Sequence, residues 1–402
     1  MKTDQESIDR FLSRSVEHVF PNREFVEARL KEGKALSLYV GVDPTGPSLH
    51  IGHAIWLRKL GEWQKLGHKV IMLIGDFTAM IGDPTDKSAV RKQLTREEVL
   101  ANCTKYKEQA SRFLRFDGEN PAELKFNSTW LAPMALDQAI GLTSYFTVNQ
   151  LLERDMFQRR MEEAKPIYLH EFLYPVMQGY DCVAMDVDGE MGGNDQTFNM
   201  LAGRDLMKSM RKKEKFVVAL KLLVDPTGMK MGKSEGNMIT FEDSADDMFG
   251  KVMSWTDGMI VGGFELCTDV SMEEVAKISK SLIRDEVNPR DVKARLAFEI
   301  VKAFHDENLA NNARDSFDSL FRDKKGPDED QIVAVTVESS PARLVDVLVV
   351  AGFAKTNSEA KRLIDQGGVK VDGTPVTDIN ATVATGSLIQ KGPRHFARVV
   401  QK

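Results

Sequence analysis

Residues 36–74 constrain the fold of this chain more than any other stretch of its sequence. An apolar run at 36–42 ends just before the turn sequence Asp-Pro-Thr-Gly, a helical pattern extends from about residue 48 to 66, and a β-branched apolar run occupies 70–74. Strand, helix and strand in such close succession predict a βαβ unit and therefore a parallel sheet. In parallel sheets, ligands bind at the carboxyl ends of the strands, often where a helix begins.

The composition is that of an ordinary globular protein. The chain has 402 residues, 42% of them hydrophobic and 28% charged, which is enough for two or three domains. Residues 1–6 are too polar and acidic for a secretory signal, and no apolar run reaches the roughly 18–20 residues of a membrane helix. Cys103, Cys182 and Cys267 lie far apart, which argues against a disulfide framework or a Cys-x-x-Cys zinc site. We therefore expect a cytoplasmic protein.

Helical and strand patterns continue on both sides of the βαβ unit. Apolar residues at helical spacing predict helices over residues 5–32, 95–116 and 132–164, and nearly all of 243–322 is helical in pattern. Apolar runs predict further strands at 183–187 and 217–224. The polar segment from 324 contains Gly-Pro, which is typical of a linker.

Two histidines follow the Asp-Pro-Thr-Gly turn. His50 and His53 are three residues apart and therefore project from one face of the predicted helix. At a helix start the backbone N–H groups and the helix dipole favour phosphate, and imidazole N–H donors there would stabilise charge on a phosphoryl oxygen. Gly52 would let a nucleotide approach the backbone. Taken alone, the pair is also compatible with surface histidines or with zinc ligands, although no third ligand follows nearby.

Two lysines lie much further along the chain. Lys230 and Lys233 belong to a glycine-containing stretch that begins 177 residues after His53. Lysine pairs usually lie on a solvated surface, but two lysines in a flexible loop also suit a second set of contacts to the same phosphates. The two motifs together indicate an enzyme that activates a substrate with ATP.

Residues 43–53 and 230–234 resemble the two signature motifs of the class I aminoacyl-tRNA synthetases. Gly232 occupies the middle position of the second motif, where the family usually has serine, and it should loosen the loop without removing either lysine. The resemblance implies an α/β fold with a Rossmann-like parallel-sheet catalytic domain. It also implies a catalytic role in phosphate stabilisation for Thr45, His50, His53, Lys230 and Lys233.

Residues 174–181 resemble the substrate helix of the bacterial tyrosyl-tRNA synthetases. On a helix, Tyr174, Gln178 and Asp181 share one face and offer a phenol, an amide and a carboxylate to a small polar ligand. An amphipathic helix with tyrosines in the core is the alternative interpretation. By resemblance, Asp181 and Tyr39 bind the phenolic hydroxyl of tyrosine, Tyr174, Gln178 and Asp83 bind its ammonium group, and Asp43 and Gln196 complete the amino-acid site.

The segment 192–196, Gly-Gly-Asn-Asp-Gln, lies between the substrate helix and the lysine motif. As a bare sequence it indicates only a loop, but the family uses such a segment against the ribose of ATP. The resemblance implies that ATP enters with Mg²⁺ as a substrate, without a protein-bound metal or an organic cofactor. The implied ATP-binding residues are Gly52, Gly193, Asp195, Leu222, Leu223, Lys230, Lys233 and Ser234.

The last module, residues 341–402, is basic in an acidic chain. It carries nine Lys or Arg against five Asp or Glu, whereas the whole chain has a net charge of −6. Its sequence is similar to the small RNA-binding domain named after a ribosomal small-subunit protein. Exposed lysines on a structural tail are the alternative. The resemblance implies that Ser358, Lys361, Arg362 and Lys370 contact the RNA backbone, which gives a salt-dependent affinity.

The resemblance also implies the domain organisation and the partners. We expect a Rossmann-like catalytic domain over 1–240 with an N-terminal helix, a dimer-interface insertion and the lysine loop, an α-helical anticodon-side domain over 241–323, a linker over 324–340 and a small α+β RNA-binding domain over 341–402. The expected partners are L-tyrosine, ATP, tRNA(Tyr) and a second copy of the chain, bound through residues around 130–165, with no membrane. Two rivals remain, a tryptophanyl enzyme and a non-catalytic RNA-binding protein on the same scaffold.

Overall fold

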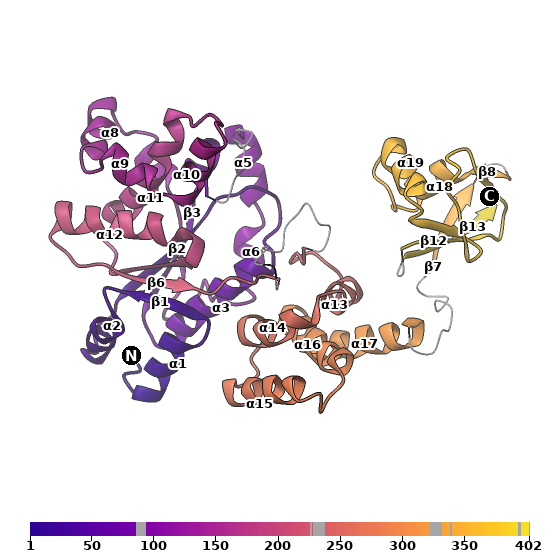
Figure 1. Cartoon of the computed structure of the whole chain (residues 1–402), viewed down its shortest axis with the longest axis horizontal. Helices are drawn as coiled ribbons and strands as arrows, with labels where there is room; N and C mark the ends of the chain where they lie inside the picture. Colours follow the sequence, from indigo (N-terminus) through magenta and orange to yellow (C-terminus); the bar gives the residue numbers. More distant parts are fainter. Residues whose placement is uncertain are drawn as a thin grey trace. The chain divides into compact units, whose positions relative to one another are not determined.

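The chain divides into two compact units, Met1–Ala310 and Asn311–Lys402 (Figure 1). The computed structural model describes residues 1–85, 94–225, 227, 238–321, 332–337, 340–392 and 395–401. Within these ranges, no helix combines the length and the apolarity needed to span a membrane.

A six-stranded sheet in the order β1-β6-β5-β2-β3-β4 forms the centre of the first unit. All neighbours are parallel except β1, which pairs antiparallel with β6, so the predicted parallel sheet is confirmed. The chain adds β3 and β4 on one side of β2 and β5 and β6 on the other. The strand order therefore reverses between β2 and β5, where such folds bind their ligands. The strands are β1 Val16–Phe20, β2 Ser37–Val42, β3 Lys69–Ile74, β4 Glu123–Phe126, β5 Gly189–Gly193 and β6 Phe216–Leu220.

Helices connect these strands and continue after the sheet is complete. Those up to the third strand are α1 Gln5–Ser13, α2 Arg23–Lys31 and α3 Ile51–Lys65. Those between the third and fifth strands are α4 Thr78–Ile81, α5 Arg96–Cys103, α6 Tyr106–Ala110, α7 Ser128–Leu131, α8 Leu136–Thr143, α9 Val148–Leu152, α10 Asp155–Glu162 and α11 Leu169–Met185. The later ones are η1 Asn194–Gln196, α12 Thr197–Arg211, α13 Ala245–Met253, η3 Asp257–Met259, α14 Ile260–Cys267, α15 Met272–Ile283, α16 Pro289–Phe304 and α17 Glu307–Phe321.

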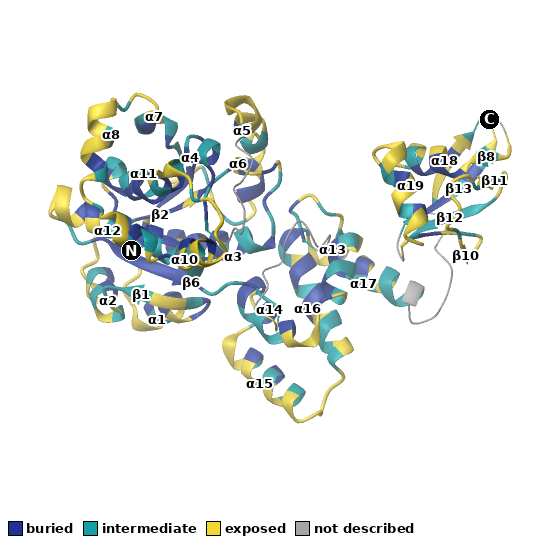
Figure 2. Cartoon of the chain, turned by 45° about the horizontal axis from the view of Figure 1, so that its top comes forward, coloured by how far each residue is buried: buried dark blue, intermediate teal, exposed yellow. Residues whose placement is uncertain are grey.

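The two faces of the sheet pack against different helices. On one face, Tyr39, Ile71 and Leu73 join a buried cluster with apolar residues of α11 and α12. On the other face, Trp63 of α3 packs against Phe216 of β6, with ring centroids 5.8 Å apart. Successive side chains of a strand point to opposite faces, so a sheet covered on both sides needs the nearly continuous apolar strands seen in this sequence. Figure 2 shows these strands as the buried centre of the unit.

The sequence predictions for residues 5–32 and 183–187 are wrong. The helix expected over 5–32 is interrupted, because Ser15 adopts a left-handed φ of 62° and residues 16–20 form β1 at the edge of the sheet. The strand expected at 183–187 is instead the end of α11, which stops at Asp186 with φ 50°. A short apolar run does not distinguish a buried strand from a buried helix end.

Arg14 ties the helical segment after the sheet to the start of the chain. Its guanidinium donates to four backbone carbonyl oxygens at and after the end of α14, those of Phe264 at 3.0 Å, Glu265 at 2.9 Å, Thr268 at 2.6 Å and Val270 at 2.7 Å. The last carbonyls of a helix lack partners within the helix, and a cation is favoured there. The helices α13 to α16 therefore belong to the same compact unit as the sheet.

The second unit contains most of α17, a five-stranded sheet in the order β10-β9-β12-β13-β7, a β8–β11 pair and the helices α18 and α19. Residues 332–337, expected to be linker, form β7 and pair in parallel with β13, because their apolar side chains complete the sheet. The linker residues 324–331 and 338–339 lie outside the described residues. The elements are β7 Ile332–Val337, β8 Ala342–Arg343, α18 Leu344–Val350, α19 Asn357–Asp365, β9 Val369–Val371, β10 Thr374–Pro375, β11 Thr382–Val383, β12 Leu388–Lys391 and β13 His395–Gln401.

Candidate active site

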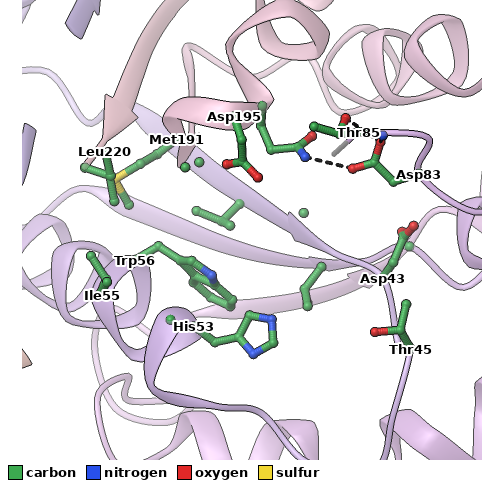
Figure 3. Close-up of a pocket in the computed structure, with 18 of the residues that line it drawn as sticks. Asp43, Thr45, His53, Ile55, Trp56, Asp83, Thr85, Met191, Asp195 and Leu220 are labelled. Carbon is green, nitrogen blue, oxygen red and sulfur yellow. Dashed lines mark hydrogen bonds between the residues drawn. The ribbon is translucent and has the colours of Figure 1, made fainter. Parts of the chain in front are cut away.

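A cleft of about 1070 Å³ opens at the carboxyl ends of β2 and β5, where the strand order reverses. Figure 3 shows His53 on one side of this cleft and Asp195 and Asp83 on the other. The cleft brings most of the predicted site residues together. Those lining it are Asp43, Thr45, His50, Gly52, His53, Asp83, Tyr174, Gln178, Asp181, Gly193, Asp195, Gln196, Leu222 and Leu223.

His50 and His53 cap the start of α3 reciprocally. The Nδ1 atom of His50 accepts the backbone N–H of Gly52 at 3.2 Å, and the Nδ1 atom of His53 accepts the backbone N–H of His50 at 3.1 Å. The two rings are stacked with centroids 3.7 Å apart. Because each Nδ1 is an acceptor, each neutral ring carries its proton on Nε2. The start of α3 therefore places two imidazole rings, each with its proton on Nε2, at the wall of the cleft.

Asp43 is held at the end of β2 by two hydroxyl groups. Tyr174 donates to its Oδ2 at 2.9 Å, and Thr78 donates to its Oδ1 at 2.8 Å. A Cβ atom on Gly75 would lie 2.0 Å from Asp43 Oδ1, so only glycine lets this carboxylate pack against the turn after β3. Burial and the neighbouring Asp43 raise the pKa of Tyr174 well above its ordinary value. Tyr174 therefore stays a hydrogen-bond donor.

Asp181 lies deep in the cleft and is 3% exposed. Trp130 Nε1 donates to its Oδ1 at 2.8 Å, and Asn127 Nδ2 donates to its Oδ2 at 3.3 Å. Burial raises the pKa of Asp181 well above its ordinary value, although these two hydrogen bonds act in the opposite direction. Each carboxylate oxygen can accept more than one hydrogen bond, so Asp181 keeps acceptor capacity for a hydroxyl group in the cleft.

Tyr39 lies behind the lining of the cleft rather than on its wall, and it is fully buried. Its hydroxyl has no hydrogen-bond partner among the described residues. Burial, with a contribution from the nearby Glu190, raises the pKa of Tyr39 well above its ordinary value. A buried hydroxyl without a partner costs roughly 1–3 kcal/mol, which a ligand group reaching it would recover.

Asp83 and Gln196, predicted from separate motifs, are in direct contact. Gln196 Nε2 donates to Asp83 Oδ2 at 2.7 Å (Figure 3). The other carboxylate oxygen accepts from the Thr85 hydroxyl at 2.6 Å, and that hydroxyl accepts from Arg154 at 2.8 Å. Asp83 is therefore fixed from both sides at the rim of the cleft.

The turn after β5 is packed tightly against the end of the next strand. A Cβ atom on Gly193 would lie 2.4 Å from Asp195 Oδ1 and 2.8 Å from Leu222 Cδ2. Glycine is thus required for Asp195 and Leu222 to approach the same patch of backbone. Leu223 is buried beside them. An acidic side chain and an apolar patch, both lining the cleft, suit a ribose and a base.

Three of the predicted ATP-binding residues belong to the lysine motif. Lys230, Lys233 and Ser234 lie outside the described residues, and their roles stay predictions. Among the residues that are described, no group of three or more His, Cys, Asp and Glu side chains is arranged to hold a metal ion.

The four predicted RNA-binding residues lie in the second unit, and all are exposed. In α19, Ala360 and Ile364 face the core of the unit, while Ser358, Lys361 and Arg362 are on the outside. Lys370 is exposed on β9. The helix therefore presents two cations and a hydroxyl to solvent.

The sequence analysis missed five residues in and beneath the cleft. Thr78, Asn127 and Trp130 hold the two carboxylates, and Glu190 and Lys215 form a buried ion pair below them. Asn127 could have been found because it directly follows a parallel strand at its carboxyl end. Glu190 and Lys215 are charged residues in or next to buried strands, a pattern that requires a partner.

Comparisons with known proteins agree over nearly the whole chain. The family profile for tRNA synthetases class I (W and Y) matches residues 31–322, and the S4 domain profile matches residues 342–389. A tyrosine–tRNA ligase of Geobacter metallireducens is 43% identical over 382 residues, which are 94% of each chain. A tyrosine–tRNA ligase of Thermotoga maritima is 41% identical over 400 residues, covering 99% of this chain and 98% of the relative.

Solved structures share the fold of most of the chain. A C-terminally truncated mitochondrial tyrosyl-tRNA synthetase of Aspergillus nidulans has a TM-score of 0.66 and 22% identity, and the match covers 79% of this chain and 95% of that chain. The tyrosyl-tRNA synthetase of Archaeoglobus fulgidus complexed with L-tyrosine has a TM-score of 0.61 and 20% identity, covering 78% and 100%. With the profile match and the relatives of nearly equal length, they show that this chain belongs to the tRNA synthetases class I (W and Y) and carries an S4 domain near its C-terminus.

Proposed function

We propose that the chain is a tyrosine–tRNA ligase. In the first step, a carboxylate oxygen of L-tyrosine attacks the α-phosphorus of ATP, the bond to the β-phosphate breaks, and tyrosyl-adenylate and pyrophosphate form. In the second step, a ribose hydroxyl at the 3′ end of tRNA(Tyr) attacks the tyrosyl carbonyl and AMP leaves. The observation that carries this proposal is the face of α11, where Tyr174, Gln178 and Asp181 line one cleft together with His50 and His53.

The phenolic end of the substrate would lie deepest in the cleft. Asp181 is buried, ordered by Trp130 and Asn127, and has acceptor capacity for a phenol O–H. The hydroxyl of Tyr39 is buried in the same region and has no hydrogen-bond partner in the part of the chain that the structure describes. Phenylalanine would leave the Tyr39 hydroxyl and the remaining acceptor capacity of Asp181 unused, and the desolvation of polar atoms that stay unpaired costs free energy. The site would therefore select tyrosine over phenylalanine through the polar groups that phenylalanine leaves unpaired.

The ammonium end would lie among acceptors nearer the rim. Tyr174, Gln178 and Asp83 line this part of the cleft, and Asp43 accepts the hydroxyl of Tyr174. Gln196, hydrogen-bonded to Asp83, would stand next to the substrate carboxylate. Fixed acceptors around the ammonium orient the carboxylate toward ATP, and such positioning lowers the barrier to displacement.

Activation would rest on charge stabilisation rather than on a covalent enzyme intermediate. The Nε2–H donors of His50 and His53, at the positive end of the α3 dipole, would stabilise phosphoryl oxygens as negative charge builds on them. Thr45 would bind the γ-phosphate, and Lys230 and Lys233 the leaving pyrophosphate. ATP would lie with its ribose at Asp195 and its base at Leu222 and Leu223, and Mg²⁺ would enter bound to ATP.

The tRNA would be bound by more than one part of the chain. We assign residues 241–323 to the anticodon side and residues 341–402 to RNA binding, with contacts from Ser358, Lys361, Arg362 and Lys370. The exposure of all four residues and the S4 match over 342–389 support this assignment. We expect the protein in the cytoplasm, where its tRNA substrate is used.

We also propose a homodimer. Eight exposed large apolar side chains lie between residues 136 and 173, and α8, with Leu136 76% exposed, is largely exposed in Figure 2. So much exposed apolar surface in one region marks an interface. A second copy of the chain is the occupant that the family implies. The residues are Leu136, Ile140, Tyr145, Val148, Met161, Tyr168, Leu169 and Leu173.

ATP–pyrophosphate exchange with tyrosine, phenylalanine and tryptophan, each supplied alone, tests the function. We expect exchange that depends on tyrosine, followed by charging of tRNA(Tyr). Exchange with tryptophan alone would indicate the tryptophanyl enzyme instead. No exchange with any amino acid, together with tRNA binding, would indicate a non-catalytic RNA-binding protein.

A further inference from the structure

A buried ion pair lies directly beneath the amino-acid end of the cleft. Glu190 of β5 and Lys215, just before β6, have side chains that are 2% and 0% exposed. The ammonium group of Lys215 donates to Glu190 Oε2 and, at 3.0 Å, to the backbone carbonyl of Met200. A Cβ atom on Gly203 would lie 2.8 Å from Lys215 Nζ, so α12 has a glycine where the ammonium needs room. Apolar residues of the same volume are often at least as stabilising as a buried pair, so stability alone does not account for it.

The second oxygen of Glu190 reaches a residue of the substrate helix. Gln178 Nε2 lies 3.3 Å from Glu190 Oε1, and both residues line the cleft. An ionised carboxylate can only accept hydrogen bonds. The NH₂ group of Gln178 must therefore face Glu190, and its carbonyl oxygen must face the other way. A glutamine without such a neighbour can turn its amide by 180° at little cost.

The ammonium group of Lys215 lies against the carboxylate of Glu190. Burial by itself would lower the pKa of Lys215, but the adjacent Cys182 and Glu190 raise it above its ordinary value, so its ammonium stays charged. The ring of Tyr39 lies on another side of this ammonium, with its centroid 5.9 Å from Nζ. As the carboxylate partner of this ion pair, Glu190 is an acceptor for Gln178 and not a donor to it.

We propose that Glu190, held by Lys215, is a positioning residue that fixes Gln178 with its amide oxygen as an acceptor for the ammonium group of the amino acid. This inference rests on the proposed function. Glu190→Gln would replace an obligatory acceptor by an amide that can either donate or accept. Gln178 could then turn its NH₂ group toward the substrate ammonium, which places donors against a cation.

Two ligands that differ at one end separate positioning from pocket shape. Tyrosinol has the phenol and the ammonium of tyrosine, whereas 3-(4-hydroxyphenyl)propionate has the phenol and no ammonium. In the full-length Glu190→Gln variant we expect tyrosinol to bind roughly tenfold more weakly, the loss of one hydrogen bond to a charged group, and the propionate to bind as in the parent. Equal weakening of both ligands would overturn the proposal, because it would show a general distortion of the cleft.

A double-mutant cycle tests whether Glu190 acts through Gln178. In a Gln178→Ala background, Glu190→Gln should have no further effect on tyrosinol, because the residue it positions is gone. An undiminished effect there would contradict the proposal. Lys215→Met combined with Glu190→Gln removes both charges at similar volume. This double variant tests the proposal if a single substitution prevents folding. It should bind tyrosinol more weakly by the same factor and bind the propionate as the parent does.

Glu171→Gln is the matched control for the loss of a buried charge. Glu171 of α11, the helix that carries Gln178, pairs with Arg160 of α10 in a second buried ion pair, with side chains 4% and 2% exposed, and it does not line the cleft. It should leave the binding of both ligands unchanged. Tyrosine-dependent pyrophosphate exchange by the parent protein checks the proposed function separately. If the parent exchanges and Glu190→Gln binds tyrosinol normally, only the positioning role is wrong.

Discussion

The imidazole rings of His50 and His53 stack with their centroids 3.7 Å apart, and the Nδ1 atom of each accepts a backbone N–H of the first turn of α3. The two histidines are therefore helix caps as well as candidate phosphate ligands. Substitution at either position would remove a helix cap of α3 and an imidazole N–H donor at the same time, unless the new side chain can still form one of these hydrogen bonds.

Asparagine at position 50 separates these two roles. Its side-chain oxygen can accept the N–H bond that His50 Nδ1 accepts, and asparagine is a good N-cap, so His50→Asn should retain the stability of the parent. Tyrosine activation should fall by roughly 100-fold because the Nε2–H donor is lost. His50→Ala should lose the same rate and, in addition, about 1 kcal/mol of stability. Single-turnover kinetics and urea unfolding measure the two effects. Equal stability of both variants would argue against the cap.

Tyr39→Phe should stabilise the free protein and weaken substrate binding. The hydroxyl of Tyr39 is buried without a partner among the described residues, so its removal should gain up to about 1–3 kcal/mol in the free energy of unfolding. Tyrosine should bind roughly tenfold more weakly, whereas phenylalanine should not. Thermal unfolding with and without tyrosine tests both. A destabilised variant would show that the hydroxyl is satisfied in the free protein.

The affinity for tyrosine should depend on the ionisation of Asp181. Because burial raises its pKa well above the ordinary value, this carboxyl takes up its proton at a higher pH than an exposed aspartate, whose pKa is about 3.9. As the pH is lowered, the protonated form should accept the phenol O–H less well, so the dissociation constant of tyrosine should rise. Phenylalanine, without a phenol, should show no such change. Asp181→Asn, which does not titrate, should bind weakly at every pH, and a parent pH profile like that of this variant would exclude the role.

Lys361 and Arg362 should contribute to tRNA binding in a salt-dependent way. Both are exposed on α19 in the S4 domain. Each alanine substitution should reduce the slope of log affinity against log salt by about 0.7–0.9, with pyrophosphate exchange unchanged. Lys34→Ala, which changes an exposed lysine in the first unit, is the control. Loss of exchange along with tRNA affinity would contradict a separate RNA-binding role.

Charges on the apolar surface between residues 136 and 173 should separate the two copies of the proposed dimer. Ile140 is 60% and Leu169 78% exposed, and their aspartate variants should sediment as monomers. Ile283 is 79% exposed at the end of α15, well outside this surface in sequence, so Ile283→Asp is the matched control and should sediment like the parent. If the parent is already monomeric, the surface has another partner.

The part of the candidate site at the end of β2 could be predicted from the sequence, because the sequence patterns that form it are local. A strand, a turn and a helix within residues 36–66 place Asp43 and His50 at the carboxyl end of a parallel strand, and the structure has them there. What could not be predicted depends on neighbours far away in the chain. The strand β1 forms because β6, about 200 residues later, offers an edge, and propensity does not report such pairing.

The same limit applies inside the site. Tyr174, Gln178 and Asp181 share a helix face, so their spacing predicts their contact. Glu190 and Lys215 meet only because β5 and β6 lie side by side, and Trp130 reaches Asp181 from a segment that carries no motif. Partners that the fold supplies to buried charges are invisible in a single sequence.

The four carbonyl bonds of Arg14 have a consequence for synthesis of the chain. The four acceptors lie about 250 residues downstream of Arg14. During synthesis, the guanidinium of Arg14 therefore stays hydrated until the ribosome has added residue 270. Contacts of such long range fold slowly, because the loop between them must close first. The sheet and the helices after it are therefore expected to fold as one cooperative unit. A chain cut at residue 240 would lack all four carbonyl acceptors of Arg14 and would leave its guanidinium exposed to solvent.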